Sequence, residues 1–325
     1  PMPDVLSLAG LMVDVTLPIE RLPLEAGHHQ MARGMFVRAG GTAPLVTMLA
    51  RLGLQAGILG YVGDDPYGHA ARQQLEAEGV DVEYLVTPEG AGSDLTLLLV
   101  DGTGRYVFLG VLGTASGGTL PDGWEERLDE TRAIVVSGWL YAQSRYPYTF
   151  VQAARDARQS GKGVVFIPGT VDADPAWLAA LFQTSDVILL DSASAGCVGA
   201  PDLESAVDTL LGSGARLVAI RLAEGGCVVA TPQARVRVPP PATPIAVTVG
   251  TAEAFNAAIL YGHLAEWPAE RIARLAIAAV AATGELRPDG NPLPTRSQSG
   301  ACSSRAMERQ ADVPRAALPL HRGSL

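Results

Sequence analysis

Fully apolar segments alternate along the chain with segments whose apolar residues recur at helical spacing. Six apolar runs predict buried strands, at Val5–Gly10, Ala56–Val62, Ala133–Gly138, Gly163–Pro168, Asp186–Asp191 and Arg216–Leu222. The helical patterns between them cover Ala43–Leu52, Tyr67–Glu78, Tyr148–Ser160, Pro175–Gln183 and Leu203–Ser213. Short apolar strands separated by helices are typical of β-α-β units, so the pattern predicts an α/β fold with a mainly parallel sheet covered on both faces.

One part of the chain departs from this alternation and predicts a separate β-structure. Ser93–Gly113 contains two strand patterns around the turn residues Asp101–Gly104, which indicates a hairpin. Together with extended residues near Met31–Val37, this hairpin predicts a small flap whose strands lie within about residues 15–38 and 93–113. A second hairpin is expected at Gly226–Val238.

The end of the chain has a different character. Periodicity fades from Arg287 onward, and residues 287–325 are rich in Pro, Ser and Arg. Such a composition is typical of a loosely attached tail. We therefore expect one α/β domain over residues 1–286, followed by this tail.

Composition excludes several classes of function. The formal net charge of −10 argues against nucleic-acid binding, which needs a basic face. The three cysteines have neither metal-ligand nor disulfide-framework spacing, so reduced thiols and no metal site are expected. No apolar run approaches the ~20 residues of a spanning helix, and the first residues do not resemble a signal peptide. We expect a soluble, cytoplasmic protein without a membrane partner.

Two features of the first fifty residues are candidates for substrate binding. Asp14 follows the first predicted strand, and ligands of parallel α/β sheets bind at the carboxyl ends of strands. Its carboxylate is able to accept hydrogen bonds from sugar hydroxyls, although a turn or helix-cap aspartate is an equally good interpretation. The Gly40-Gly41 pair permits a close approach of ligand to backbone, but glycines in turns are more often structural.

Two later turns are candidates for phosphate chemistry. In Ala246–Leu264 an apolar strand pattern runs into Gly250-Thr251-Ala252-Glu253, and a helix is expected from about Ala254. A glycine turn before a helix directs amides at an anion, and a carboxylate there is able to act as a base; an ordinary acidic first-turn residue is the alternative. Ala219–Gly226 ends a strand in a glycine turn that forms either a nucleotide-site wall or a hairpin entrance. Neither GxxxxGK[ST] nor a usable GxGxxG fingerprint occurs.

Taken in order, these features resemble the ribokinase-like (PfkB) family of carbohydrate and nucleoside kinases, over roughly Val5–Thr283. The most specific matches are Gly40–Leu85 and Ala252–Gly262. The resemblance implies a three-layer α/β domain with a mainly parallel central sheet and a small β-sheet lid, which in this family often forms a homodimer. It also implies ATP with Mg²⁺ and phosphorylation of a hydroxyl of a sugar or nucleoside.

The resemblance assigns roles by position. It implies that Asp14, Gly40 and Gly41 bind the acceptor and that Glu253 is the catalytic base. The implied anion hole is Gly250, Thr251 and Ala252. The implied nucleotide-binding residues are Arg221, Ala223, Gly226 and Asn256.

The chain departs from the family pattern at several of these positions. The family's Gly-Ala-Gly-Asp stands here as Gly250-Thr251-Ala252-Glu253, without the usual preceding Asp, and the substrate-binding Asn after the glycine pair is absent. The Mg²⁺-associated Asn-x-x-Glu aligns with Asp191–Ser194, and the nucleotide-contacting Thr-Leu-Gly-Glu aligns with Arg221–Glu224. Two hypotheses follow. The chain is an ATP-dependent sugar or nucleoside kinase, or it is a catalytically impaired or inactive homologue that binds a sugar or nucleotide for regulation.

Overall fold

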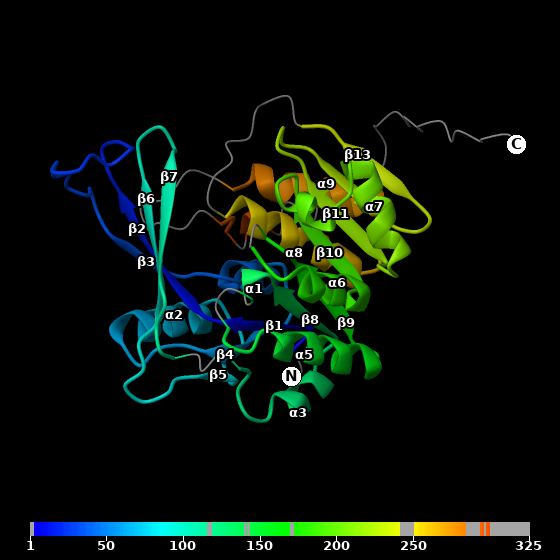
Figure 1. Cartoon of the computed structure of the whole chain (residues 1–325), viewed down its shortest axis with the longest axis horizontal. Coiled ribbons are helices and arrows are strands. Elements are labelled where there is room, and N and C mark those ends of the chain that lie inside the picture. The colour runs from blue at the N-terminus through cyan, green and yellow to red at the C-terminus, as the bar shows by residue number, and fades with distance from the viewer. Residues whose placement is uncertain are drawn as a thin grey trace, which may run out of the picture.

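The computed structural model of the chain describes residues 3–115, 119–139, 141, 144–169, 172–240, 250–283, 293–295 and 297–299. Its strands form two sheets (Figure 1). A nine-stranded sheet has the order β13-β12-β11-β10-β9-β8-β1-β4-β5, and a four-stranded sheet has the order β3-β2-β6-β7. In Figure 1 the smaller sheet stands to one side of the helices that surround the larger one.

The large sheet is mainly parallel, as the sequence predicts. Its parallel strands are β1 (Val5–Gly10), β4 (Ala56–Tyr61), β5 (Leu85–Val86), β8 (Ala133–Ser137), β9 (Gly163–Ile167), β10 (Val187–Asp191) and β11 (Leu217–Arg221). The antiparallel strands β12 (Cys227–Ala230) and β13 (Arg235–Val238) extend it at one edge. The central strands are buried on both faces, which explains why they appear in the sequence as continuous apolar runs.

Helices cover both faces of this sheet and make the fold three-layered. The helices are α1 (Ala43–Arg51), α2 (Pro66–Ala77), α3 (Trp124–Asp129), α5 (Tyr148–Gln159), α6 (Pro175–Thr184), α7 (Leu203–Gly212), α8 (Thr251–Leu264) and α9 (Ala269–Ala281), with a 3₁₀ turn at η1 (Ser194–Val198). One apolar core packs α1, α2, α8 and α9 against the sheet, and the other packs α3, α5, α6 and α7 against the opposite face. The expected three-layer α/β architecture is confirmed.

Several helices begin where the sequence supplies both a cap and a proline. The Asp65 side chain accepts a hydrogen bond from the Gly68 amide at 2.8 Å, directly before Pro66. Asp174 caps α6 in the same way, accepting from the Ala176 amide at 2.9 Å. An aspartate before proline satisfies a free amide and presets the first helical φ, which fixes these starts.

The small sheet forms the lid and contains the strands β2 (Met12–Pro18), β3 (Phe36–Ala39), β6 (Asp94–Val100) and β7 (Tyr106–Val111). β2 follows β1 after the single residue Leu11, so one nearly continuous stretch of chain runs from the large sheet into the lid. Asp14 therefore lies on a lid strand and not in a turn after the first strand. This placement was missed because the sequence pattern from Val5 to Pro18 is almost uniformly apolar.

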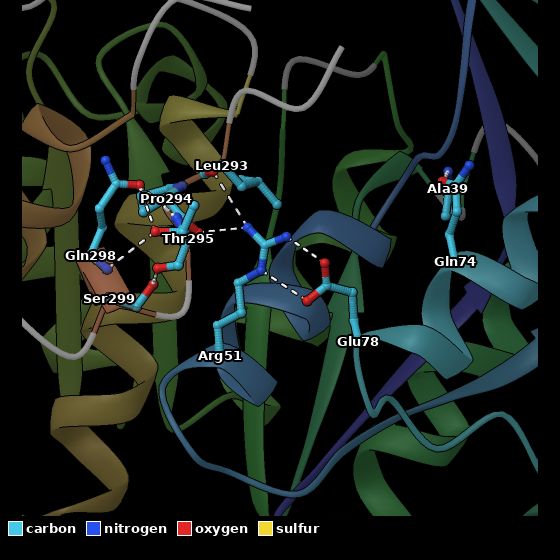
Figure 2. Close-up of polar contacts among 9 residues, drawn as sticks. All are labelled: Ala39, Arg51, Gln74, Glu78, Leu293, Pro294, Thr295, Gln298 and Ser299. Atoms are coloured by element: carbon cyan, nitrogen blue, oxygen red, sulfur yellow. Dashed lines mark hydrogen bonds and ion pairs between the residues drawn. The ribbon is translucent and has the colours of Figure 1, made fainter. Parts of the chain in front are cut away.

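Part of the segment expected to be a loosely attached tail is docked on the domain. Arg51 of α1 donates hydrogen bonds to the carbonyls of Leu293 and Pro294, at 3.4 and 2.6 Å (Figure 2). Leu293 and Ser299 are buried. The remaining tail residues lie outside the described ones. Within the described part of the chain, no helix has the length and apolarity needed to cross a bilayer.

Candidate active site

The start of α8 is the centre of the candidate site. Gly250 is the N-cap with φ of 92°, a left-handed conformation that glycine adopts without strain. The first-turn amides of a helix lack partners within it, and their dipoles give that end a positive potential. The helix begins at Thr251, three residues earlier than expected, so Ala252 has ordinary helical geometry. The strand predicted before Gly250 lies outside the described residues.

Glu253 stands in the first turn of α8, beside these amides. Burial raises the pKa of its carboxyl above the ordinary value, while the positive charge of Arg221 lowers it. The side chain nevertheless keeps partial solvent access. A carboxylate whose pKa is raised toward neutrality accepts a proton more readily than an ordinary surface glutamate, which suits a general base.

Asp14 lies close enough to Glu253 for the two carboxylates to interact. Burial, and secondly the negative charge of Glu253, raise the pKa of Asp14 to about 7; a hydrogen bond with Thr96 opposes this shift. Thr96 on β6 and Arg38 on β3 stand directly opposite Asp14 in the lid sheet and share its face. The lid therefore holds Asp14 between a hydroxyl and a cationic residue, within electrostatic range of Glu253 in the first turn of α8.

Gly40 packs against the Asp14 carboxylate so closely that no side chain fits. A Cβ placed on Gly40 would overlap both carboxylate oxygens of Asp14. The Gly40 amide donates to the Met12 carbonyl at 2.8 Å, which fixes this approach. The next residue, Gly41, has φ of 61° and leads into α1. Glycine is therefore needed at position 40 because no Cβ fits beside Asp14, and it is favoured at position 41 because of the positive φ.

The remaining predicted residues come from the carboxyl ends of β10 and β11. Arg221 ends β11 and forms an ion pair with Asp191 at the end of β10, with 3.4 Å between the guanidinium and carboxylate. The Ala223 amide donates to the Ser192 hydroxyl at 3.1 Å. Through its charge, Arg221 also links this corner to Glu253. The connection between Asp191, Arg221 and Glu253 was missed from the sequence because it depends on strand order.

Gly226 and Asn256 have different environments. A Cβ on Gly226 would overlap the Val238 carbonyl, so the close pairing of β12 with β13 already accounts for this glycine. Asn256 follows Glu253 by three positions on α8, so the two residues lie on the same side of the helix.

The described residues contain no group of three or more metal-ligating side chains close enough to hold an ion. Asp191 is a carboxylate near the phosphate end of the site, but its Oδ1 accepts the Ser194 amide at 2.8 Å and its Oδ2 pairs with Arg221. The described side chains therefore form no dedicated Mg²⁺ site, and an Mg²⁺ ion here would be held mainly by nucleotide phosphates and water, with at most one or two protein carboxylates.

A known protein family matches this chain over nearly its whole length. The model of the pfkB family of carbohydrate kinases matches residues 2–296. The chain belongs to this family. It is 30% identical over 281 residues to the ATP-dependent ribose-1-phosphate kinase of Halopiger xanaduensis, covering 86% of this chain and 91% of that protein. It is 26% identical over 279 residues to mouse ribokinase, covering 81% of this chain and 82% of that protein.

Solved structures of kinases share the fold. Arabidopsis thaliana ribokinase complexed with ribose and ATP aligns with a TM-score of 0.75 at 19% identity, covering 93% of this chain and 99% of that one. A ribokinase II of E. coli in complex with ATP and Mg²⁺ aligns with a TM-score of 0.78 at 15% identity, over 94% and 100% of the two chains. Adenosine kinase from Sinorhizobium meliloti gives 0.76 at 20% identity, over 94% and 100%.

Proposed function

We propose that this PfkB-family chain transfers the γ-phosphoryl group of ATP to a hydroxyl of a sugar or nucleoside. The proposal rests on the effect of the Glu253 charge on the pKa of Asp14, which indicates that the implied acceptor residue on the lid and the implied base on α8 lie within electrostatic range of each other. A helix start with its glycine N-cap lies at the same point and supplies positive potential for the phosphoryl oxygens.

In the proposed reaction Glu253 removes the proton from the acceptor hydroxyl as its oxygen attacks the γ-phosphorus. A bond forms between that oxygen and phosphorus, the bond from phosphorus to the bridging oxygen breaks, and ADP leaves. In the proposed anion hole, Gly250, Thr251 and Ala252 at the start of α8 stabilise the negative charge of the transferring group, and electrostatic stabilisation of this kind is usually the largest single contribution to such a step. Asp14 and the Gly40-Gly41 turn hold the acceptor.

ATP with Mg²⁺ is the proposed phosphoryl donor. Arg221 lies at the carboxyl end of β11, and its positive charge lowers the pKa of Glu253. We propose that its guanidinium also contacts a phosphate of ATP. Ala223 and Gly226 form the turn that follows, and Asn256 lies on α8. Mg²⁺ would neutralise the charge of the phosphates, and Asp191 is the protein carboxylate that would help to hold it. We propose that the protein acts in the cytoplasm, where ATP is available, and that it has no nucleic-acid partner.

Two observations favour a phosphorylated pentose as the first acceptor to test. The relative from Halopiger xanaduensis is named for ribose 1-phosphate and covers most of the chain. Arg38 stands directly opposite Asp14 on the same face of the lid, where a guanidinium complements a phosphate. We propose that Arg38 helps to bind an anionic acceptor. The structure of the described residues adds nothing in favour of the impaired or inactive homologue beyond the altered motif residues of the sequence.

We also propose that the lid pairs with the lid of a second copy. Every residue of β7 is exposed, including Tyr106, Phe108 and Leu109, each at least 50% exposed. β7 is the edge strand of its sheet, and an exposed apolar edge strand is typically covered by another chain.

The test of the main proposal is ATP consumption with Mg²⁺ over a panel containing D-ribose, D-ribose 1-phosphate and adenosine, followed by identification of the phosphorylated product. Acceptor-dependent release of ADP supports the proposal. ATP and acceptor that both bind, as measured by calorimetry, without any phosphorylated product would instead support the inactive homologue.

A further inference from the structure

Gln74 of α2 and Glu78, the C-cap residue of the same helix, are polar side chains one helical turn apart that contact parts of the chain distant in sequence. The Gln74 side chain contacts the lid strand β3, and the Glu78 side chain contacts Arg51 of α1 (Figure 2). Neither residue belongs to the proposed reaction machinery. Both lie on segments that approach it.

Gln74 completes the outer edge of β3 at the base of the lid. Its Nε2 donates to the Val37 carbonyl at 2.8 Å, and its Oε1 accepts from the Ala39 amide at 3.1 Å. Among the described strands β3 is an edge strand that pairs with β2 alone, so the amide side chain takes the hydrogen bonds that a further strand would take. Ala39 directly precedes Gly40, the residue that packs against Asp14.

Arg51 fixes the C-terminal end of this helix, one turn beyond Gln74. It is almost fully buried, with 6% of its side chain exposed, and its Nε donates to Glu78 at 2.9 Å while Nη2 contacts the second carboxylate oxygen. The remaining nitrogen, Nη1, donates to the Leu293 and Pro294 carbonyls. A bidentate guanidinium–carboxylate pair has a defined orientation, so Arg51 sets the position of Glu78 relative to both α1 and the C-terminal segment.

We propose that Gln74 is a positioning residue for the acceptor end of the site, and that Arg51 and Glu78 couple it to the docked C-terminal residues 293–295. Docking of that segment on α1 fixes α2, α2 fixes the end of β3 through Gln74, and β3 sets the contact of Gly40 with Asp14. The inference rests on the proposed function for its kinetic consequence, but the mechanical link is measurable without turnover.

The decisive variant is Gln74→Met, which keeps the length of the side chain and removes both hydrogen bonds. The neighbouring Gln73 is exposed on the same helix, so Gln73→Met is the matched control. Hydrogen exchange of the full-length protein, followed by mass spectrometry, reads out residues 34–41 directly. We expect about tenfold faster exchange there in Gln74→Met and no change in Gln73→Met. Unchanged exchange in both variants would overturn the link.

The kinetic arm distinguishes positioning from simple structural support. With D-ribose 1-phosphate or D-ribose as the acceptor, whichever the wild type phosphorylates, Gln74→Met should raise the acceptor KM about tenfold and leave the KM for ATP within about twofold. If the wild type phosphorylates neither, calorimetric binding of the same two sugars replaces KM. Faster exchange without a selective loss of acceptor binding would refute the positioning role.

Arg51→Met tests the coupling to the C-terminal segment. It should reproduce the faster exchange at residues 34–41, and its effect should not add to that of Gln74→Met in the double variant, because both act through one helix. Additive effects would contradict the coupling. If Arg51→Met fails to fold, Glu78→Gln, which keeps a hydrogen-bond acceptor at a more exposed residue, provides the same comparison.

Discussion

The carboxylates of Asp14 and Glu253 interact across the candidate site, and the charge of Glu253 helps to raise the pKa of Asp14 to about 7. One residue comes from the lid and the other from the first turn of α8. This relationship joins the acceptor end of the proposed site to its phosphate end.

Replacing Asp14 should reveal its raised pKa in the stability of the protein. The folded protein keeps this proton to about pH 7, whereas the unfolded chain loses it near pH 3.8, so the free energy of unfolding falls between these values and is level above them. Asp14→Asn removes this effect. Denaturant titrations should find the variant more stable by about 1–2 kcal/mol near pH 8, a value discounted for partial solvent access. A difference that does not depend on pH would contradict the raised pKa.

Gly40→Ala should weaken acceptor binding because its Cβ would displace the Asp14 carboxylate. We expect kcat/KM for the acceptor to fall about 10²-fold, with the thermal shift produced by Mg·ATP unchanged. Gly102→Ala is a suitable control, since a Cβ there meets nothing within 4 Å. Equal effects of both substitutions on acceptor binding would argue against the steric role of Gly40.

Arg221→Met should move the acidic limb of the pH–rate profile to higher pH. Glu253 acts as a base only when ionised, and the charge of Arg221 lowers its pKa, so removal of that charge raises the pKa further. The KM for ATP should also rise. Asp191→Asn breaks the same ion pair but keeps the guanidinium, and its acidic limb should not move upward. An unshifted pH–rate profile for Arg221→Met would contradict the proposed effect of Arg221 on the catalytic base.

Charged residues on both faces of β7 should prevent the proposed pairing of lids. Phe108→Glu with Leu109→Glu is expected to yield a monomer in sedimentation velocity, where the wild type sediments as a dimer. Val86→Glu, at an exposed apolar position outside the lid, is the control and should remain dimeric. A monomeric wild type would contradict the proposed lid pairing, and the proposed reaction would be unaffected.

The architecture was predictable because its signals are local. Buried parallel strands appear as apolar runs, and Asp65-Pro66 and Asp174-Pro175 mark helix starts within a few residues of sequence. The hairpin of the lid was marked by the turn at Asp101–Gly104. The apolar run from Val5 to Pro18 gave no sign that the chain leaves one sheet and enters another at Leu11.

The site was predictable only as separate candidates. The family resemblance named Asp14, Gly40 and Glu253, but how close they lie to one another depends on the position of the lid relative to α8. The contacts of Arg51 and Gln74 have no sequence signature, because each joins segments at least 27 positions apart through ordinary polar side chains. Long-range pairing of this kind is determined by the packing of the layers and not by any local pattern.

The most direct test of the account is the turnover number of Glu253→Gln with a phosphorylated acceptor identified for the wild type. The substitution keeps size and polarity and removes the base, so kcat should fall about 10²–10⁴-fold while the KM for ATP changes little. Glu253→Asp keeps a carboxylate and should retain more activity than Glu253→Gln. A kcat for Glu253→Gln equal to that of the wild type would contradict the proposed chemistry at the start of α8.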